Sequence, residues 1–303
     1  MPAQLLEGAP IAERIRESLR PEIARLKAEG VGAKVVALTI ADSPASRAYG
    51  RAQKQAFESV GVAFEPREIG PATTQAELLA WIAALNADEA VTGVTIHLPL
   101  TAPLDGRGAV LALAPHKDIE GTHPANVGML TLGPWEPASC SARAGVELLR
   151  SVRPELRGLD VTILGKGEVV GKPLLLMMLE HKKDAATPTV VHTGTRDLAE
   201  RTRAADVIFC AAGKPGLLRG NMVKPGAIVI DIAINQVPVF GADGRPASNA
   251  KGRPQTRLVG DAVLEELMPV CSYVTPVPGG VGPVATMLLV RNWVACCRRH
   301  KKA

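Results

Sequence analysis

Aromatic residues are scarce in this sequence: two tyrosines, four phenylalanines and three tryptophans make up 3% of 303 residues. Single-stranded RNA is usually read by aromatic side chains set in a basic surface. The formal net charge is only +5 and no basic stripe accompanies it, since the dense run from Arg298 to Lys302 is interpreted as a solvated tail. The composition therefore argues against nucleic acid and favours a small anionic ligand.

Paired cysteines are also missing. None of the five cysteines forms a CxxC motif or a His/Cys ligand spacing, which predicts no structural zinc and a reducing, cytoplasmic environment. His116 and His123 have no ligand spacing either, so we expect no metal. The five cysteines are Cys140, Cys210, Cys271, Cys296 and Cys297.

Long hydrophobic runs are absent as well. The first twenty residues mix charged and apolar side chains without the apolar core of a secretion signal, and no later window is long enough to span a bilayer. No internal repeat or low-complexity tract occurs. We therefore expect a soluble, cytoplasmic protein that does not bind membranes.

What the sequence does contain is typical of a two-domain α/β protein. Its length exceeds the usual range of a single core, and 47% of the residues are hydrophobic against 21% charged. Helical and strand patterns alternate, as in βαβ units. The predicted helices lie at about 9–29, from Ser43-Pro44 onward, and at 74–86, 143–149, 174–179 and 285–297; the predicted strands lie at 35–40, 91–98, 160–164, 189–192, 207–211, 228–232 and 273–275.

A loop-rich stretch from Gly121 to Ser141 separates two predicted domains. We expect residues 1–141 to form an N-terminal α/β catalytic domain that binds substrate. Residues 142–284 should form a Rossmann-like, doubly wound nucleotide-binding domain, and the helix within 285–303 should pack back on the first domain. An active-site cleft is expected between the two domains, because functional groups gather at the carboxyl ends of parallel strands.

A glycine-rich turn follows the strand predicted at 160–164. Gly165, Gly167 and Gly171 stand where a strand runs directly into a helix, and backbone N–H groups at a helix start can bind a diphosphate. The spacing is one residue longer than the usual dinucleotide fingerprint, and a tight turn that needs positive φ explains the motif equally well. The strand context favours a dinucleotide.

The next strand indicates which dinucleotide. It ends in His192-Thr193, without the acidic residue that accepts the ribose 2′-hydroxyl of NAD. Lys166 and Thr193 instead offer a cation and a hydroxyl to a 2′-phosphate. The sequence therefore favours NADP over NAD, and His192 is interpreted as a strand-end residue near the cofactor.

The nine residues Thr275 to Pro283, TPVPGGVGP, contain three prolines and three glycines. Such a segment is stiff and has little side-chain bulk, as a wall against a flat ring requires. A rigid hinge between domains is the alternative, and both can hold.

Together these motifs resemble the methylenetetrahydrofolate dehydrogenase/cyclohydrolase family. The segments that carry the resemblance, in the family's order, are 43–49 (SPASRAY), 117–121 (KDIEG), 165–173 (GKGEVVGKP), 231–235 (DIAIN) and TPVPGGVGP. Members oxidise 5,10-methylenetetrahydrofolate with NADP, and many then hydrolyse the methenyl product to 10-formyltetrahydrofolate. The resemblance also suggests a homodimer formed through the second domain.

The family's substrate site carries a Tyr-x-x-x-Lys motif on a helix, a Gln in a QLPL loop and the second Asp of KDVDG. Here Tyr49 matches, but Gln53 stands at the Lys position, His97 at the Gln position and Glu120 at the Asp position. Because residues four apart share a helix face, Tyr49 and Gln53 should point the same way and Lys54 about 100° away.

These departures bear on the hydrolysis more than on the oxidation. Hydride transfer mainly needs orientation, whereas water attack needs a proton acceptor, and Gln53 is neutral at any pH. His97 could supply that base; the alternative, which we favour, is that it only bonds a backbone group at a strand end. Glu120 should bind the pterin; the alternative is a solvated carboxylate in a loop. Tyr49 should face the same site; the alternative is an aromatic residue of the core.

The predicted function is NADP-dependent oxidation of 5,10-methylenetetrahydrofolate with a lost, weakened or rewired cyclohydrolase. The alternatives are a non-catalytic folate- or nucleotide-binding paralogue, and the same chemistry on another one-carbon carrier. The predicted catalytic residues are Tyr49, Gln53, His97 and Glu120; the cofactor-binding residues are Gly165, Lys166, Gly167, Val169, Gly171, Thr193 and Ile234; and the substrate-binding residues are Tyr49, Glu120, Pro278, Gly279 and Gly280.

Overall fold

A computed structural model describes residues 2–31, 34–41, 43–179, 183–240, 247–248 and 255–300, without the side chains of residues 44, 45 and 300. The chain divides into two compact units. The three-stranded unit holds Ala12–Arg143 and Ala285–Ala303, and the six-stranded unit holds Met1–Ile11 and Ala144–Val284. The predicted two-domain α/β fold is confirmed.

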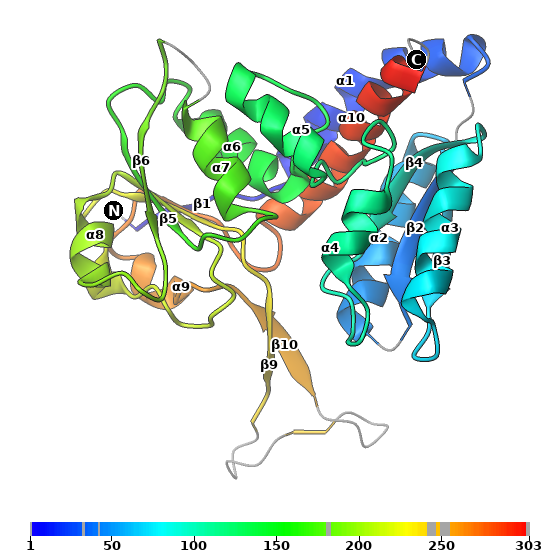
Figure 1. Cartoon of the computed structure of the whole chain (residues 1–303). Helices are drawn as coiled ribbons and strands as arrows, with labels where there is room; N and C mark the ends of the chain where they lie inside the picture. The colour runs from blue at the N-terminus through cyan, green and yellow to red at the C-terminus, as the bar shows by residue number, and fades with distance from the viewer. Residues whose placement is uncertain are drawn as a thin grey trace. The chain divides into compact units, whose positions relative to one another are not determined.

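The three-stranded unit has a parallel sheet in the order β3-β2-β4, with helices packed against it (Figure 1). The central strand β2 is almost wholly buried, and α3 covers it and β4 with an apolar face that includes Leu78 and Ile82. The strands are β2 (Lys34–Ile40), β3 (Ala63–Ile69) and β4 (Val91–Ile96); the helices wholly within this unit are α2 (Pro44–Ser59), α3 (Gln75–Ala87), α4 (Gly106–Ala112), α5 (Pro124–Met129) and the short η1 (Leu130–Leu132).

The segment that carries Glu120 extends this sheet. Val94 on β4 forms a parallel bridge with Asp118, and its N–H donates to Lys117 O at 2.7 Å. Glu120 is thereby carried alongside Thr95 on β4, so this short pairing positions a predicted site residue.

Strand β3 was not predicted from the sequence. Its residues AFEPREI include Pro66 and three charged residues, a composition depleted in strands. Within the described part of the chain β3 pairs only with β2, so it is an edge strand, where proline and charge are tolerated and limit pairing with other chains.

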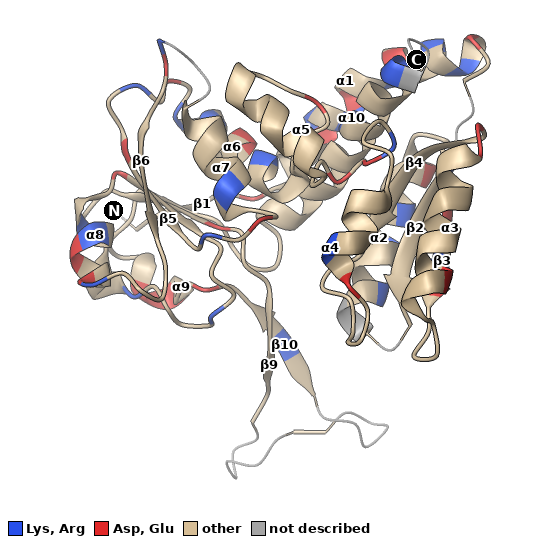
Figure 2. Ribbon diagram, in the orientation of Figure 1, with Lys and Arg blue, Asp and Glu red and all other residues tan. Residues whose placement is uncertain are grey.

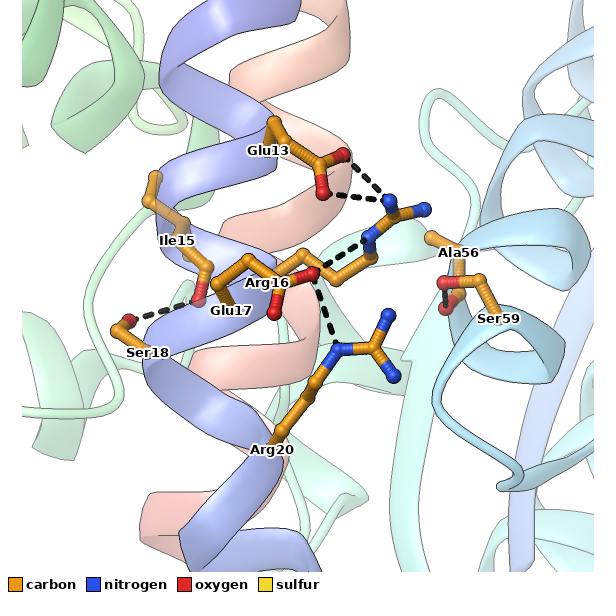
Figure 3. A network of polar contacts seen from close by, with 8 residues as sticks. All are labelled: Glu13, Ile15, Arg16, Glu17, Ser18, Arg20, Ala56 and Ser59. Carbon is orange, nitrogen blue, oxygen red and sulfur yellow. Dashed lines mark hydrogen bonds and ion pairs between the residues drawn. The ribbon is translucent and has the colours of Figure 1, made fainter.

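Helix α1 (Ala9–Ala28) carries ion pairs between residues one turn apart, as Figure 3 shows. Glu13 with Arg16 and Glu17 with Arg20 are spaced three residues apart, the latter pair at 3.0 Å. Exposed pairs of this kind contribute only about 0.2–0.5 kcal/mol each. Throughout the described residues Lys and Arg are interspersed with Asp and Glu along the elements (Figure 2).

The six-stranded unit has a sheet in the order β1-β11-β8-β7-β5-β6, parallel throughout. This agrees with the predicted Rossmann-like domain. Its strands are β1 (Gln4–Leu5), β5 (Asp160–Leu164), β6 (Thr187–Val191), β7 (Val207–Cys210), β8 (Ile228–Asp231) and β11 (Tyr273–Val274); the helices wholly within it are α7 (Gly171–Leu179), α8 (Leu198–Ala204), α9 (Leu264–Leu267) and the short η2 (Gly220–Met222).

The first eleven residues differ from the expectation, which placed them in the N-terminal domain. They belong to the six-stranded unit because β1 pairs in parallel with β11 and closes the edge of that sheet. A two-residue strand is too short for any periodic signal. The hairpin of β9 (Asn235–Pro238) and β10 (Thr256–Val259), which projects from the sheet in Figure 1, was also not predicted.

Helices α1, α6 (Cys140–Val152) and α10 (Val281–His300) each run across the division between the units. Most of α10 is buried, and Trp293 Nε1 donates to Thr92 Oγ1 on β4 at 2.9 Å. The part of α10 after residue 284 therefore packs on the three-stranded unit. None of the helices in the described residues is long and apolar enough to cross a membrane.

Candidate active site

Helix α2 presents three polar side chains on one face. Its N-cap Ser43 accepts a hydrogen bond from Ser46 N at 3.1 Å, which fixes the start of the helix. Ser46, Tyr49 and Gln53 follow at intervals of three and four residues and so share a side of α2. Gln53 is fully buried, whereas Lys54 is exposed and lies 3.7 Å from Glu58, as the helical spacing predicts.

His97 follows directly after β4 and is 5% exposed. Its Nδ1 lies 2.7 Å from Ser46 Oγ and its Nε2 lies 2.9 Å from Gln53 Oε1. Assigned from these contacts, the Nε2–H donates to the amide oxygen, which can only accept, and Nδ1 accepts from the hydroxyl. The Ser46 oxygen in turn accepts from Ile40 N at 2.9 Å. The expected bond from the ring to a backbone group is thus not formed, because side chains of α2 lie nearer.

The environment of His97 keeps its ring neutral. Burial lowers the pKa of His97 to about 4. The Tyr49 ring packs beside it, with ring centroids 5.1 Å apart. At neutral pH His97 is therefore an uncharged donor and acceptor with both nitrogens engaged.

Glu120 joins the residues of α2 and β4. Its Oε1 accepts from Thr95 Oγ1 at 2.7 Å, from Gln53 Nε2 at 3.3 Å and from Tyr49 OH at 3.4 Å. The pKa of Glu120 is raised to about 7, mainly by burial and to a smaller extent by the nearby carboxylate of Asp118, while the three donors act in the opposite direction. The structure therefore brings together all four predicted catalytic residues.

Neighbouring groups are held in their uncharged forms. Burial raises the pKa of Tyr49 and of Cys140 well above their ordinary values, and the Glu120 carboxylate adds to both effects. Cys140 is the N-terminal residue of α6 and accepts a contact from Asn292 Nδ2 at 3.1 Å. Neither group supplies a charge to the site at neutral pH.

The segment before Glu120 is fixed by two buried charged residues. Lys117 Nζ donates to the carbonyls of Leu85, Asn86 and Asp88 at 2.8–2.9 Å, at the C-terminal end of α3. Asp118 accepts from Gly121 N at 3.1 Å and from His123 N and Asn126 Nδ2. Three backbone carbonyls and three donors thus hold the loop that carries Glu120.

Sequence reasoning missed the contributions of Ser46 and Thr95. Ser46 lies seven residues before Gln53, a spacing that returns to the same helix face. Thr95 lies two residues before His97, and alternate residues of a strand share a face. Both signals were present in the sequence, but they become meaningful only once the partner element is known.

In the six-stranded unit the glycine turn connects β5 to α7. Gly165 has φ of +119°, and a Cβ there would come within 2.3 Å of Ala211 O. A Cβ on Gly171 would come within 2.1 Å of Gly165 O, whereas one on Gly167 would meet nothing within 4 Å. Two glycines therefore close the turn, and the third leaves open space beside the start of the helix, which suits a diphosphate.

Lys166 and Thr193 follow neighbouring strands. Leu164 at the end of β5 is in register with Val191 at the end of β6, so both residues stand two positions beyond paired strand ends. Both residues are exposed. Val169 and Ile234 are exposed apolar residues, 39% and 64% accessible, and Ile234 follows β8.

Residues 278–280, which are predicted to form a wall against a flat ring, are closely packed at Gly280. Gly279 has φ of +112°, and its carbonyl accepts from Gly8 N at 2.8 Å. A Cβ on Gly280 would come within 2.7 Å of the Thr275 side chain. Side chains at these two positions are therefore excluded, and the Pro278–Gly280 segment stays bare.

Asp231 and Asp261 order the loops beside this segment. Asp261 accepts from Ala212 N, Gly213 N and Lys214 N at 2.6–3.1 Å, and so fixes the loop after β7. Burial raises the pKa of Asp231 to about 7. A cavity of about 350 Å³ lies next to Asp231 under the β9–β10 hairpin, but none of the predicted site residues lines it.

Comparison with known proteins identifies the family. Residues 6–120 match the family model "Tetrahydrofolate dehydrogenase/cyclohydrolase, catalytic domain", and residues 139–301 match the corresponding NAD(P)-binding domain. The chain belongs to the tetrahydrofolate dehydrogenase/cyclohydrolase family. The family resemblance stated from the sequence is confirmed, and the six-stranded unit is its NAD(P)-binding domain.

Relatives in this family match along their whole length. The Bifunctional protein FolD 2 of Mesorhizobium japonicum is 39% identical over 299 residues, covering 99% of this chain and 93% of its own. The Bifunctional protein FolD of Moorella thermoacetica is 38% identical, covering 99% and 100%. The methylenetetrahydrofolate dehydrogenase-cyclohydrolase of Trypanosoma brucei, solved with NADP and an inhibitor, has a TM-score of 0.89 at 32% identity and covers all of both chains.

The described residues contain no group of three or more His, Cys, Asp or Glu side chains that could hold a metal ion. The five cysteines are free and buried. The polar site of the family's catalytic domain therefore consists of hydroxyl, amide, imidazole and carboxyl groups.

Proposed function

We propose that this protein oxidises 5,10-methylenetetrahydrofolate to 5,10-methenyltetrahydrofolate with NADP, and that its cyclohydrolase activity is weakened. The observation that carries the proposal is the match of both family domains, in order, over residues 6–120 and 139–301. The glycine turn and the four-residue polar site lie in the domains where the chemistry needs them.

The residues of the NAD(P)-binding domain fit NADP. The open space at Gly167 admits a diphosphate to the start of α7, and the exposed Lys166 supplies a cation for a 2′-phosphate beside the Thr193 hydroxyl. NADP supplies the hydride acceptor when bound. Val169 and Ile234 offer apolar contact surface, and residues 278–280 a bare wall for a flat ring.

In this proposal the catalytic domain orients the folate. Glu120 accepts hydrogen bonds from the amino and ring N–H groups of the pterin. Tyr49 packs against the pterin with the face of its ring that is turned away from His97. Hydride transfer then depends on how these residues hold the methylene carbon, since orientation is the main requirement of that step.

Hydrolysis needs more than orientation. Gln53 stands where the family motif has a lysine, and an amide can neither accept nor release a proton at physiological pH. The neutral ring of His97 is engaged by Ser46 and Gln53 and has a pKa of about 4, so it is a weak base there. These contacts support a reduced hydrolysis rate rather than a histidine-based one.

The test is a spectrophotometric assay of methenyl formation with NADP, and with NAD in parallel. Methenyl formation that requires NADP and is slower with NAD is the expected result. Absence of product at saturating substrate rejects the dehydrogenase. A ligand-induced thermal shift without turnover would then indicate a binding paralogue, and turnover only with another folate would indicate a different carrier. Sedimentation analysis tests the homodimer that the family resemblance suggests.

A further inference from the structure

Thr95 is a buried residue of β4 to which the proposed function gives no task; its side chain is 1% exposed. Its Oγ1 donates to Glu120 Oε1 at 2.7 Å, the shortest of the three hydrogen bonds that this oxygen accepts. Gln53 Nε2 and Tyr49 OH donate to the same oxygen from 3.3 and 3.4 Å. Thr95 is therefore the closest anchor of the carboxyl.

The backbone around Thr95 and the segment of Glu120 are joined directly. Val94 forms the parallel bridge with Asp118, and its carbonyl accepts from Ile119 N at 3.2 Å. A β-branched side chain in a strand has few rotamers, so the direction of the Thr95 hydroxyl is set by β4. The donors from α2 have longer or larger side chains and lie farther from the carboxyl. The position of Glu120 thus depends mainly on the strand.

The anchor also decides which oxygen of Glu120 faces a ligand. All three of these hydrogen bonds fall on Oε1, and none of them reaches Oε2. The residue is partly exposed, so Oε2 is left to meet a donor from outside the protein. A glutamate loses considerable rotamer freedom when it is ordered, and a short bond to a rigid strand makes that loss before a ligand arrives.

We propose that Thr95 is a positioning residue for substrate: its hydroxyl holds Glu120 Oε1 against β4, so that Oε2 is directed at the N–H groups of the pterin. Glu120 is one methylene longer than the aspartate of the family motif, and the bond to Thr95 takes up that extra reach. The inference rests on the proposed function and deepens it by naming the residue that fixes the pterin-binding carboxyl.

The titratable groups around Glu120 leave Thr95 a clear effect on its charge. Burial raises the pKa of Glu120 to about 7, and the hydrogen bond from Thr95 is the largest of the effects that lower it. The Asp118 carboxylate on the same segment raises it. Tyr49 on α2 and Cys140 on α6 are uncharged at neutral pH, because burial raises their pKa values well above the ordinary ones.

His97 lies at the end of β4 and reaches Glu120 only through Gln53, and burial lowers its pKa to about 4, so it is neutral too. A proton that binds Glu120 therefore goes to Oε2, because Oε1 already meets three donors. A protonated Oε2 is a donor and no longer suits the N–H groups of a pterin. Loss of the Thr95 bond should thus weaken pterin binding most at low pH.

The first experiment compares Thr95→Val, which removes the hydroxyl and keeps the branched shape, with Thr95→Ser, which keeps a hydroxyl. In Thr95→Val the KM for 5,10-methylenetetrahydrofolate should rise about tenfold or more, as expected for a lost hydrogen bond to a charged group. The kcat and the KM for NADP should change by less than about threefold, since binding rather than chemistry is affected. Thr95→Ser should restore most of the affinity.

Thr92→Val is the matched control on the same strand. Thr92 is also buried, but its Oγ1 accepts from Trp293 Nε1 at 2.9 Å and donates to Lys34 O at 3.3 Å, away from Glu120. Its loss costs stability without touching the carboxyl, so the KM for the folate should follow the wild type. If Thr95→Val does not fold, Thr95→Cys replaces it, because a thiol is a weaker donor and should raise the KM in the same direction.

A double-mutant cycle shows whether Thr95 acts through the length of Glu120. In Glu120→Asp the carboxyl is one methylene shorter and is withdrawn from Thr95. Adding Thr95→Val to Glu120→Asp should therefore change the KM for the folate by less than about threefold. An equal effect of Thr95→Val in both backgrounds would overturn the inference, because Thr95 would then act independently of Glu120.

The pH dependence of binding separates positioning from a loss of structure. Calorimetric titration with tetrahydrofolate between pH 6 and 9 should show an affinity that falls as the pH drops below about 7. In Thr95→Val this fall should begin at higher pH, and in Thr95→Ser it should stay near its place in the wild type. A Thr95→Val variant that binds more weakly by the same factor at every pH would contradict the proposal.

These measurements distinguish failure of the inference from failure of the proposed function. Oxidation that proceeds with an unchanged folate KM in Thr95→Val overturns the inference alone. Absence of oxidation, with tetrahydrofolate binding that still depends on Thr95, rejects the dehydrogenase and supports the inference. A wild type that binds no tetrahydrofolate overturns both.

Discussion

Four side chains of the catalytic domain form an unbroken line of hydrogen bonds, from Ser46 through His97 and Gln53 to Glu120. Each member fixes the direction of the next, because Gln53 can donate to Glu120 only while its oxygen accepts from His97. Replacing one residue in such a line changes what its neighbours must do.

Replacing Gln53 by lysine restores the ammonium of the family motif at the position whose amide nitrogen now lies 3.3 Å from Glu120 Oε1. An ammonium stabilises the carboxylate, so the pKa of Glu120 should fall below about 7. The ratio of hydrolysis to oxidation at neutral pH should rise about tenfold or more. Rate profiles of both reactions measure this.

The double change Gln53→Lys with His97→Gln should exceed the single change. In the single variant the Nε2–H of His97 faces the new ammonium, and two donors meet unless the ring changes tautomer. A glutamine at 97 offers a carbonyl instead. Gln53→Met serves as the control without a charge, and an equal ratio in the Lys and Met variants would contradict the prediction.

At this scale the sequence predicted four residues that the structure brings together, but not all of their contacts. The four-residue spacing of Tyr49 and Gln53 was enough to place both on one face and Lys54 on another. The partners of His97 could not be predicted, because Ser46 and Gln53 lie 51 and 44 residues away and meet it only through packing of α2 on the sheet. The pKa of Glu120 likewise depends on burial, which no local pattern reveals.

At the scale of elements, α3 and the loop of Glu120 are joined by Lys117. The helix ends at Ala87 without enough partners for its last carbonyls, and the Lys117 ammonium donates to three carbonyls in this region. All three of its N–H groups are thereby used inside the protein.

Lys117→Met should destabilise the protein by about 2–4 kcal/mol, because three carbonyls lose a charged donor in a buried place. Urea unfolding at pH 7 measures the change, and Lys54→Met, on an exposed face of α2, is the matched control. Oxidation and hydrolysis should both decline, since the loop that carries Glu120 starts at this anchor. Equal stability of the two variants would contradict the account of Lys117.

Elements with strong periodicity were predicted well and those at sheet edges were not. The strand at residues 160–164 has the predicted limits, and α3 begins after Thr74 with a capping box, as its sequence indicated. β1, β3 and the β9–β10 hairpin were missed because each is short, charged or at an edge. In such strands pairing partners, rather than local preference, decide the structure.

For the whole molecule, two buried carboxyls link stability to pH, one in each unit. The pKa of Glu120 is raised from 4.5, and that of Asp231 from 3.8, to about 7 in both cases. At pH values between the ordinary pKa and the raised pKa of each group, the folded state binds more protons than the unfolded state. The free energy of unfolding contributed by each group therefore falls as pH rises from about 4 to 7.

Other groups act in the opposite direction. Ion pairs lower the pKa of Glu22 to about 2, so its contribution is lost as the pH falls below about 4.5. The pKa of His97 is about 4 in the folded state. Its contribution to the free energy of unfolding therefore falls as the pH drops below about 6.5, where the unfolded ring gains a proton. The total curve mixes these contributions, and only differences between the wild type and single variants isolate one carboxyl.

Glu120→Gln and Asp231→Asn should each gain stability relative to the wild type as pH rises from 5 to 8, by about 2 kcal/mol with allowance for the partial exposure of Glu120. Urea unfolding at four pH values in that range gives the differences. The amide at either position keeps an oxygen that accepts from the existing donors. The gain in the free energy of unfolding therefore measures the effect of removing the ionisable group. A difference that is constant with pH would mean that the carboxyl is ionised throughout.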